Sequence, residues 1–410
     1  MSRLTVIDEM FLRRHRGFGT PIAMQGLWRT ADRVEAGLLI GVHNRLRHGP
    51  LARRVVRSRI PGARASWVSD AWAIPLDYPA TTIVSDAVVA WADVQARNLD
   101  PSTGPPWFLS ATTVSDGGTV VSLCCSHAVA DAQALVRAAD LALTGTTETI
   151  AAQSISDWRD ARTTWRRIIT GTRVPPRPGR SDPPVGAKTL PARTAILAAD
   201  AAAWDAVAAD HGGSANSVFV AVVVGVLRAT GERGDVDVGL PIDQRGTHTD
   251  TGNDSATGNA MGMASTTVHA RDTLATIHDR CRDAFAAPDG PPPGLPPEWL
   301  HVLPARLAHA ATRGAGEHDV LCSNIGTLPD SLAALGPHRA TGVATRALHP
   351  GLNASHLADL RTRLAGYLCR LGDTYTLALV AFDAVITSDT HLRDLAAAEL
   401  DHWGMSTTPW

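Results

Sequence analysis

The chain has 410 residues, of which 44% are hydrophobic and 19% are charged, and its formal net charge is −2. This length is enough for two hydrophobic cores of about 200 residues each. A net charge so close to zero gives no general attraction to nucleic acid or to anionic lipid, so the sequence predicts a protein without a nucleic-acid partner.

Cysteine spacing and apolar runs exclude further classes. The five cysteines have no CxxC spacing and the histidines have no HExxH spacing, which argues against a disulfide framework and against a metal site. The start of the chain lacks the apolar segment of a signal peptide, and the longest apolar run, Val218 to Leu227, is too short to span a bilayer. These features predict a soluble cytoplasmic protein without a transmembrane segment.

The first part of the chain alternates helical and extended patterns. Apolar residues spaced by three and four predict helices, and β-branched apolar runs predict strands. Two such runs flank Asp116-Gly117-Gly118, a sequence typical of a hairpin turn. The predicted elements are helices at Leu4–Leu12, Val34–Leu46, Asp86–Asn98 and Ile155–Thr170, a strand at Ile22–Trp28, and hairpin strands at Phe108–Val114 and Thr119–Cys125.

A histidine directly follows the second hairpin strand. Ser126 and His127 end the apolar run, and the alanine-rich segment after them predicts the start of a helix, so a strand delivers His127 to a turn. The carboxylate of Asp131 can hold that turn or accept a cation, which leaves the imidazole free. A neutral imidazole, with a pKa of about 6.5, can act as a general base. The spacing alone also permits a histidine that merely ends a strand.

A segment dense in Pro, Gly and Arg divides the chain. Residues 173–190 have the composition of a linker, which predicts an N-terminal lobe at residues 1–172 and a C-terminal lobe at residues 191–410. The predicted elements of the second lobe are strands at Arg193–Leu197, Val236–Ile242 and Met261–Val268, helices at Ala201–His211, Ser214–Leu227 and Arg271–Phe285, a hairpin of Leu364–Leu371 and Thr374–Phe382, and a helix at His391–Trp403.

Several segments, in order along nearly the whole chain, resemble one superfamily. SHAVADA, at residues 126–132, resembles the HHxxxDG signature of peptide-synthetase condensation domains, wax ester synthase/diacylglycerol acyltransferases and chloramphenicol acetyltransferase. LTVIDEMFL, LDPSTGPPW, LPIDQRG and the closing YLCRLGDTYTLALVAFD resemble further segments of that superfamily. The resemblance implies an α/β fold of the α+β sandwich type, with two chloramphenicol-acetyltransferase-like lobes in a V shape and an active-site tunnel between them.

The same resemblance implies roles for individual residues. His127 is expected to be the catalytic base, and Arg245, in LPIDQRG, is expected to pair with Asp131 and support the motif. Cys124 and Cys125 are a rival pair of nucleophiles next to the histidine. Candidate contacts to an oxyanion or to the acceptor are Ser126, Asn259, Ser323 and Asn324.

The implied reaction moves an acyl group from a coenzyme A or carrier-protein thioester to an alcohol or amine, in natural-product or lipid biosynthesis. No permanently bound cofactor is expected, because acyl-coenzyme A or acyl-phosphopantetheine is a co-substrate, and an acyl or peptidyl carrier protein is an expected partner. Ser126 and Ala132 stand where the signature has His and Gly. Two alternatives therefore stay open: a condensation-fold enzyme that uses His127 for cyclisation, dehydration or epimerisation, and a non-catalytic protein that docks a carrier.

Overall fold

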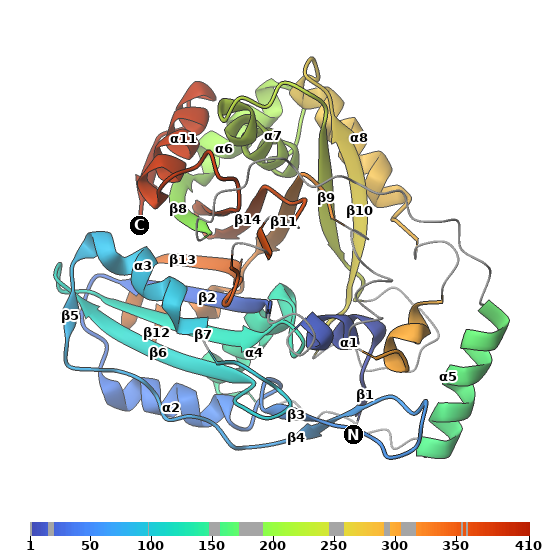
Figure 1. The fold of residues 1–410 in the computed structure, drawn as a ribbon. Helices are drawn as coiled ribbons and strands as arrows, with labels where there is room; N and C mark the ends of the chain where they lie inside the picture. Colours follow the sequence, from blue (N-terminus) through green and yellow to red (C-terminus); the bar gives the residue numbers. More distant parts are fainter. Residues whose placement is uncertain are drawn as a thin grey trace.

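The computed structural model describes residues 2–14, 20–96, 98–146, 156–171, 192–245, 258–290, 296–304, 317–353, 356–357 and 360–410 (Figure 1). Within these residues the chain forms a six-stranded sheet, a seven-stranded sheet and a small three-stranded sheet. In Figure 1 the six-stranded sheet lies below the seven-stranded sheet, and helices cover both. The mixed α/β fold that the sequence predicts is confirmed.

The six-stranded sheet is built around the predicted hairpin. Its order is β12-β13-β2-β7-β6-β5, and the hairpin consists of β6 (Trp107–Val114) and β7 (Thr119–Ser126). β2 (Ala23–Thr30) pairs with β7 on the other side, and β5 (Thr82–Ile83) forms one edge. All eight residues of β7 are buried, which explains its nearly continuous apolar sequence.

Helices cover both faces of this sheet. Gln25 and Gly26 are successive residues of β2, so they face opposite sides. The Gln25 amide donates to the carbonyl of Ala92 in α3 (Val88–Asp93), whereas Gly26 faces Leu135 in α4 (Ala132–Thr144). The predicted helix at residues 86–98 is three short pieces, since η2 (Ser85–Ala87) and η3 (Val94–Ala96) flank α3. α2 (Ala36–Leu46) packs against α4.

The other edge of the six-stranded sheet comes from the second half of the chain. β13 (His338–Leu348) pairs antiparallel with β2, and η6 (Asp330–Ala333) and β12 (Ala334–Leu335) precede it. The sequence patterns do not predict this strand. The predicted linker lies outside the described residues, so the lobe boundaries stay a prediction. These boundaries do not account for β13, which belongs to the second half of the chain but pairs in the sheet of the first half.

The seven-stranded sheet contains most of the second half of the chain, in the order β10-β9-β11-β14-β15-β8-β16. The predicted hairpin of β14 and β15 lies within it, and β11 pairs parallel with β14. The bounds are β10 (Met261–Val268), β9 (Val236–Asp243), β11 (Val320–Thr327), β14 (Leu364–Leu371), β15 (Thr374–Ala381), β8 (Arg193–Asp200) and β16 (Thr407–Pro409).

Helices α6 (Ala201–Asp210), α7 (Ala215–Ala229), α8 (Leu274–Ala286) and α11 (Asp389–His402) pack on this sheet, as the upper part of Figure 1 shows. α7 is apolar on all sides and lies in the core, as expected for a helix without a polar face. Its N-cap is Ser214, whose side chain forms a capping box with Ser217.

A helix near the N-terminus connects the two sheets. α1 (Val6–Arg13) follows β1 (Ser2–Arg3), which forms a small sheet with β4 (Ser66–Ser69) and β3 (Arg53–Val56). Figure 1 places α1 beside the six-stranded sheet, below the lower ends of β9 and β10. α5 (Asp157–Gly171) and η5 (Pro297–His301) lie on its outer side, and a buried Asp160 pairs with Arg64 at 2.8 Å to attach α5.

No helix among the described residues is by itself long and apolar enough to cross a membrane, and α6 and α7 reach that length and apolarity only as a pair bent by 92°. No group of three or more His, Cys, Asp or Glu side chains in the same part of the chain is arranged to hold a metal ion.

Candidate active site

His127 lies in the turn between β7 and α4. Its backbone N–H donates to the carbonyl of Ile22, just before β2, at 2.8 Å. The hydroxyl of Ser126 is fully buried and accepts a hydrogen bond from the N–H of Ala128 at 3.2 Å. The end of β7 is therefore attached to the neighbouring strand, and its own serine closes the turn.

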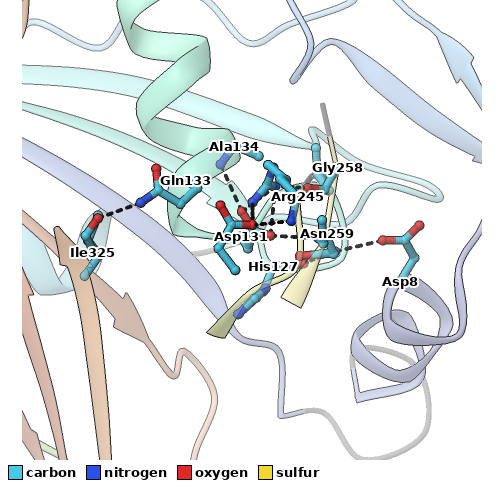
Figure 2. A network of polar contacts seen from close by, with 12 residues as sticks. Asp8, His127, Asp131, Gln133, Ala134, Arg245, Gly258, Asn259 and Ile325 are labelled. Atoms are coloured by element: carbon cyan, nitrogen blue, oxygen red, sulfur yellow. Dashed lines mark hydrogen bonds and ion pairs between the residues drawn. The ribbon is translucent and has the colours of Figure 1, made fainter. Parts of the chain in front are cut away.

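Asp131 connects this turn to the seven-stranded sheet. It is the N-cap residue of α4, and its Oδ1 accepts from the N–H of Ala134 at 2.9 Å. Arg245, two residues after β9, donates from Nη2 to both carboxylate oxygens, at 2.8 and 2.9 Å. The N–H of Ala260, just before β10, donates to Oδ2 at 2.9 Å. Figure 2 shows Arg245 and Ala134 beside this carboxylate, and the side chain of Asp131 is only 9% exposed.

Arg245 is held in turn by its own strand end. Its Nη1 donates to Asp243 Oδ1 at 2.9 Å, and its Nη2 also donates to the carbonyl of Gly258. A Cβ at Gly258 would lie 2.9 Å from Nη2 of Arg53, so a larger residue there would require the Arg53 side chain to shift. The ends of β9 and β10 therefore approach the histidine turn closely.

Asn259 fixes the backbone of the histidine. Its Nδ2 donates to the carbonyls of His127 and Ala128, at 2.9 and 3.2 Å, and to Oδ1 of Asp8 at 2.8 Å (Figure 2). Its Oδ1 is buried and has no hydrogen-bond partner among the described residues. Asn259 therefore uses its donors inside the protein, and its predicted contact with the acceptor stays a prediction.

Asp8 extends the network to α1 and to the small sheet. It forms the capping box of α1 with Thr5, and it accepts from Nε1 of Trp67 at 3.0 Å. Arg53 lies over the Trp67 ring, 4.4 Å from its centroid, and donates to the carbonyl of Val129 in the histidine turn. Three separate parts of the chain thus hold the backbone around His127.

The imidazole of His127 makes none of these bonds. Figure 2 shows its ring directed away from the pair of Asp131 and Arg245. The ring stacks on Phe11 of α1, with centroids 3.7 Å apart and planes at 13°, and Nδ1 has no hydrogen-bond partner among the described residues. Burial lowers the pKa of His127 and outweighs the opposing effects of its backbone hydrogen bond, the Asp131 carboxylate and the Asn259 side chain. The ring is therefore neutral at pH 7 and able to accept a proton.

The other two predicted contacts lie on β11. Cys322 packs in the core under α7, so Ser323 faces the opposite side of the sheet. Asn324 donates to the side chain of Asn216 at the start of α7, at 3.1 Å, and so faces α7. Neither side chain forms a hydrogen bond with His127 in the described part of the chain, and their roles stay predictions.

The rival thiols are poorly suited to be nucleophiles. Cys124 and Cys125 are both fully buried. Burial raises the pKa of Cys124 to about 11 and that of Cys125 further, so neither forms the reactive thiolate near neutral pH.

Three residues near His127 were missed by the sequence analysis. Phe11 stacks on the ring, and Arg14 follows it one helical turn later. His349 comes directly after β13, and its ring contacts Phe382 edge-on at 4.9 Å. The apolar period of the first helix could have indicated an inward face at Phe11. No pattern in the sequence singles out Arg14 or His349.

Comparisons of the sequence find no relative, because neither a protein-family model nor a curated protein matches it. Solved structures do match. The first condensation domain of the CDA synthetase has a TM-score of 0.59 and 14% identity, and the match covers 98% of this chain and 96% of that chain. This chain has the condensation-domain fold.

Two further full-length matches have the same fold. The wax ester synthase/diacylglycerol acyltransferase from Marinobacter aquaeolei VT8 has a TM-score of 0.56 and 14% identity, and the match covers 98% of this chain and 100% of that chain. The polyketide synthase associated protein 5 from Mycobacterium tuberculosis has a TM-score of 0.55 and 16% identity, and the match covers 98% of each chain. In the nonribosomal peptide synthetase FmoA3, with TM-score 0.56 and 16% identity, the match covers 98% of this chain and 42% of that longer chain. The predicted superfamily resemblance is confirmed for the fold, and identities this low concern the fold alone.

Proposed function

We propose that this condensation-fold protein is an acyltransferase. It moves an acyl group from a thioester, on coenzyme A or on the phosphopantetheine of a carrier protein, to an alcohol or amine. The observation that carries the proposal is the state of His127: its backbone is held from both halves of the chain, while its ring makes no protein hydrogen bond through Nδ1 and is neutral. A base of this kind contributes roughly 10²–10⁴-fold to a rate.

In the proposed reaction, the oxygen or nitrogen of the acceptor attacks the thioester carbonyl with its lone pair, and His127 removes the proton from that atom. The carbonyl oxygen becomes an anion, the tetrahedral intermediate collapses, and the carbon–sulfur bond breaks. The proton on His127 then passes to the leaving thiolate. Asp131 and Arg245 position the turn and exchange no proton, since their contacts are made within the protein.

The names of the matching proteins support a biosynthetic setting. They include a condensation domain of a synthetase, a wax ester synthase and a protein associated with a polyketide synthase. A carrier-protein donor is therefore part of the proposal beside coenzyme A. Natural-product or lipid biosynthesis is the corresponding context.

The test is a screen of the purified protein against acyl-coenzyme A and acyl-carrier thioesters by mass spectrometry. We expect one thioester to be consumed and its acyl mass to appear on an alcohol or amine acceptor. His127→Ala should lower turnover at least 100-fold. The matched control is His48→Ala, because His48 is exposed in the same half of the chain and should leave turnover unchanged.

Other results would contradict the proposal. Full turnover in the His127→Ala variant would remove the histidine from the reaction. An isomeric product or the loss of water, without acyl transfer, would indicate cyclisation, dehydration or epimerisation in the same fold. Carrier binding that does not depend on His127, with no turnover of any thioester, would indicate a docking protein.

A further inference from the structure

A cavity lies on the outer side of α1, between this helix, the small sheet, α5 and η5. Its volume is about 320 Å³, within the range of cavities that hold small ligands. The wall includes two charged side chains, two indoles and an imidazole: Glu9, Arg57, Trp165, Trp299 and His301. None of these residues belongs to the network around His127.

Helix geometry separates this cavity from the His127 ring. Successive residues of an α-helix are turned by about 100°, so Glu9 and Phe11 point in nearly opposite directions. Phe11 stacks on His127, whereas Glu9 lines the cavity. The cavity is therefore a second site, on the opposite face of α1 from the candidate catalytic base.

The walls of the cavity are attached to one another. Trp165 of α5 donates from Nε1 to the carbonyl of Pro61 at 3.2 Å. Its indole also lies directly against Gly62, where a Cβ would be only 2.1 Å from Nε1. Arg13 of α1 donates to the carbonyl of Leu303, just after η5. The indole of Trp165 is thus held in place by the protein itself, which lowers the cost of ordering a site when a ligand binds.

The charge at the cavity is positive. Glu9 is buried and pairs with Arg13 at 2.8 Å, while Arg57 lies 3.5 Å from the same oxygen and its side chain is 47% exposed. Two arginines therefore share one carboxylate. Burial lowers the pKa of His301 to about 3, and the arginines around it outweigh the opposing charge of Asp160, so this imidazole is neutral at pH 7. The guanidinium of Arg57 is the positive charge that a ligand can use.

We propose that this cavity binds a small aromatic carboxylate. The flat ring of the ligand lies against the indoles of Trp165 and Trp299, and its carboxylate accepts hydrogen bonds from the guanidinium of Arg57. Aromatic pairs are favourable beyond the area that they bury, and a guanidinium matches a carboxylate with two parallel N–H donors. The excess positive charge disfavours an amine ligand. This site does not depend on the proposed acyl transfer.

Isothermal titration calorimetry with indole-3-acetate tests the site without any turnover. We expect saturable binding with a dissociation constant of about 1 mM or lower. Arg57→Gln should bind at least tenfold more weakly, because the charge-assisted hydrogen bonds are lost. The matched control is Arg59→Gln, which removes an exposed arginine two residues along that does not line the cavity, and its affinity should stay within twofold of the wild type.

Two further ligands separate the charge from the ring. Indole-3-acetamide has the shape of indole-3-acetate without its charge, so it should bind the wild type at least tenfold more weakly than the acetate does. Its affinity should be the same in Arg57→Gln. Cyclohexylacetate keeps the carboxylate but has no flat ring, so it should also bind more weakly than indole-3-acetate.

Indole signals locate the ligand in the protein. In ¹⁵N-labelled protein, the Nε1–H signals of Trp165 and Trp299 are assigned by their absence in Trp165→Phe and Trp299→Phe. We expect indole-3-acetate to shift both signals in the wild type. Binding should be unchanged in His127→Ala, because His127 lies across α1 from the cavity.

Several results would overturn the inference. They are the absence of saturable binding, equal affinity of the wild type and Arg57→Gln for indole-3-acetate, and loss of binding in His127→Ala, which would move the ligand to the candidate active site. Equal affinities of the wild type for the acetate and the acetamide would reject the carboxylate contact without any variant. Arg57-dependent binding in a protein that consumes no thioester would retain the cavity site and reject acyl transfer. A circular dichroism spectrum equal to that of the wild type establishes that each variant is folded.

Discussion

At the scale of single residues, Asp131 connects the two sheets through its hydrogen bonds. Its carboxylate accepts from one guanidinium and from two backbone N–H groups, one on α4 and one before β10. A buried ion pair of this kind adds little net stability, because desolvation offsets the Coulomb attraction, but removal of one member leaves the other without compensation. The pair of Asp131 and Arg245 therefore fixes the position of the histidine turn and adds little to the free energy of unfolding.

Removal of the Asp131 carboxylate should destabilise the protein. In Asp131→Ala, α4 loses its N-cap and Arg245 loses its counterion, and we expect the free energy of unfolding to fall by about 3 kcal/mol. Asp131→Asn keeps a side-chain oxygen for the cap, so its loss should be about 1 kcal/mol smaller. Urea unfolding curves measure both differences.

The coupling between the two residues provides the control. In a double-mutant cycle of Asp131→Asn and Arg245→Gln, we expect the two effects to be non-additive by at least about 1 kcal/mol. Strictly additive effects would mean that the ion pair does not connect the two sheets in solution. Turnover should fall in each single variant, since the turn that carries His127 is then less well held.

The sequence predicts the central part of the site and not its surroundings. His127, Asp131 and Arg245 lie in short segments that resemble known motifs, and the structure places the last two together. Arg14 is one of 38 Lys and Arg residues in the chain, and nothing local distinguishes it. Its position depends on how the end of α1 packs against a turn more than a hundred residues away, which no local pattern contains.

At the scale of elements, the hairpins and long helices agree with their sequence patterns, and β13 does not. Its sequence, HRATGVATRAL, lacks both the alternation of a half-buried strand and the apolar run of a buried one. The reason is Arg346, which is fully buried in the middle of the sheet. It pairs with Asp93 of α3 at 2.7 Å and donates to Gln25 of β2 at 2.8 Å. At this position of the strand an ion pair takes the place of an apolar contact.

Arg346 should therefore be necessary for the docking of β13. In Arg346→Met, Asp93 loses its counterion and the side-chain oxygen of Gln25 loses its donor. We expect the free energy of unfolding to fall by roughly 3–5 kcal/mol. The double variant Arg346→Met/Asp93→Asn removes the remaining charge and should recover part of that loss. Urea unfolding measures both.

The same strand offers the matched control. Arg339 lies in β13 but is exposed, so Arg339→Met should change the free energy of unfolding by no more than about 0.5 kcal/mol. Equal effects of the two substitutions would show that burial of Arg346 is not what holds the strand.

At the scale of the whole molecule, the pairing of β13 with β2 makes the folding of the first half of the chain depend on a strand from the second half. The sequence predicts two lobes from a change in composition at residues 173–190, and composition says nothing about which strands pair. Val343 lies opposite Trp28 in the paired strands β13 and β2. Pairings between residues so far apart in the sequence are not encoded in any local pattern, because they form only when the rest of both sheets is in place.

The pairing of β13 with β2 predicts how fragments of the chain behave. Residues 1–171 expressed alone lack β13, so the unpaired edge of β2 is exposed, and we expect an insoluble or non-cooperatively folded fragment. Co-expression with residues 192–410 restores the strand and should give a complex that co-purifies. In the second fragment, Ala344→Pro removes a backbone donor in the middle of β13, opposite Leu27, and should abolish co-purification. Cooperative urea unfolding of residues 1–171 alone would contradict this dependence and would support two independent lobes.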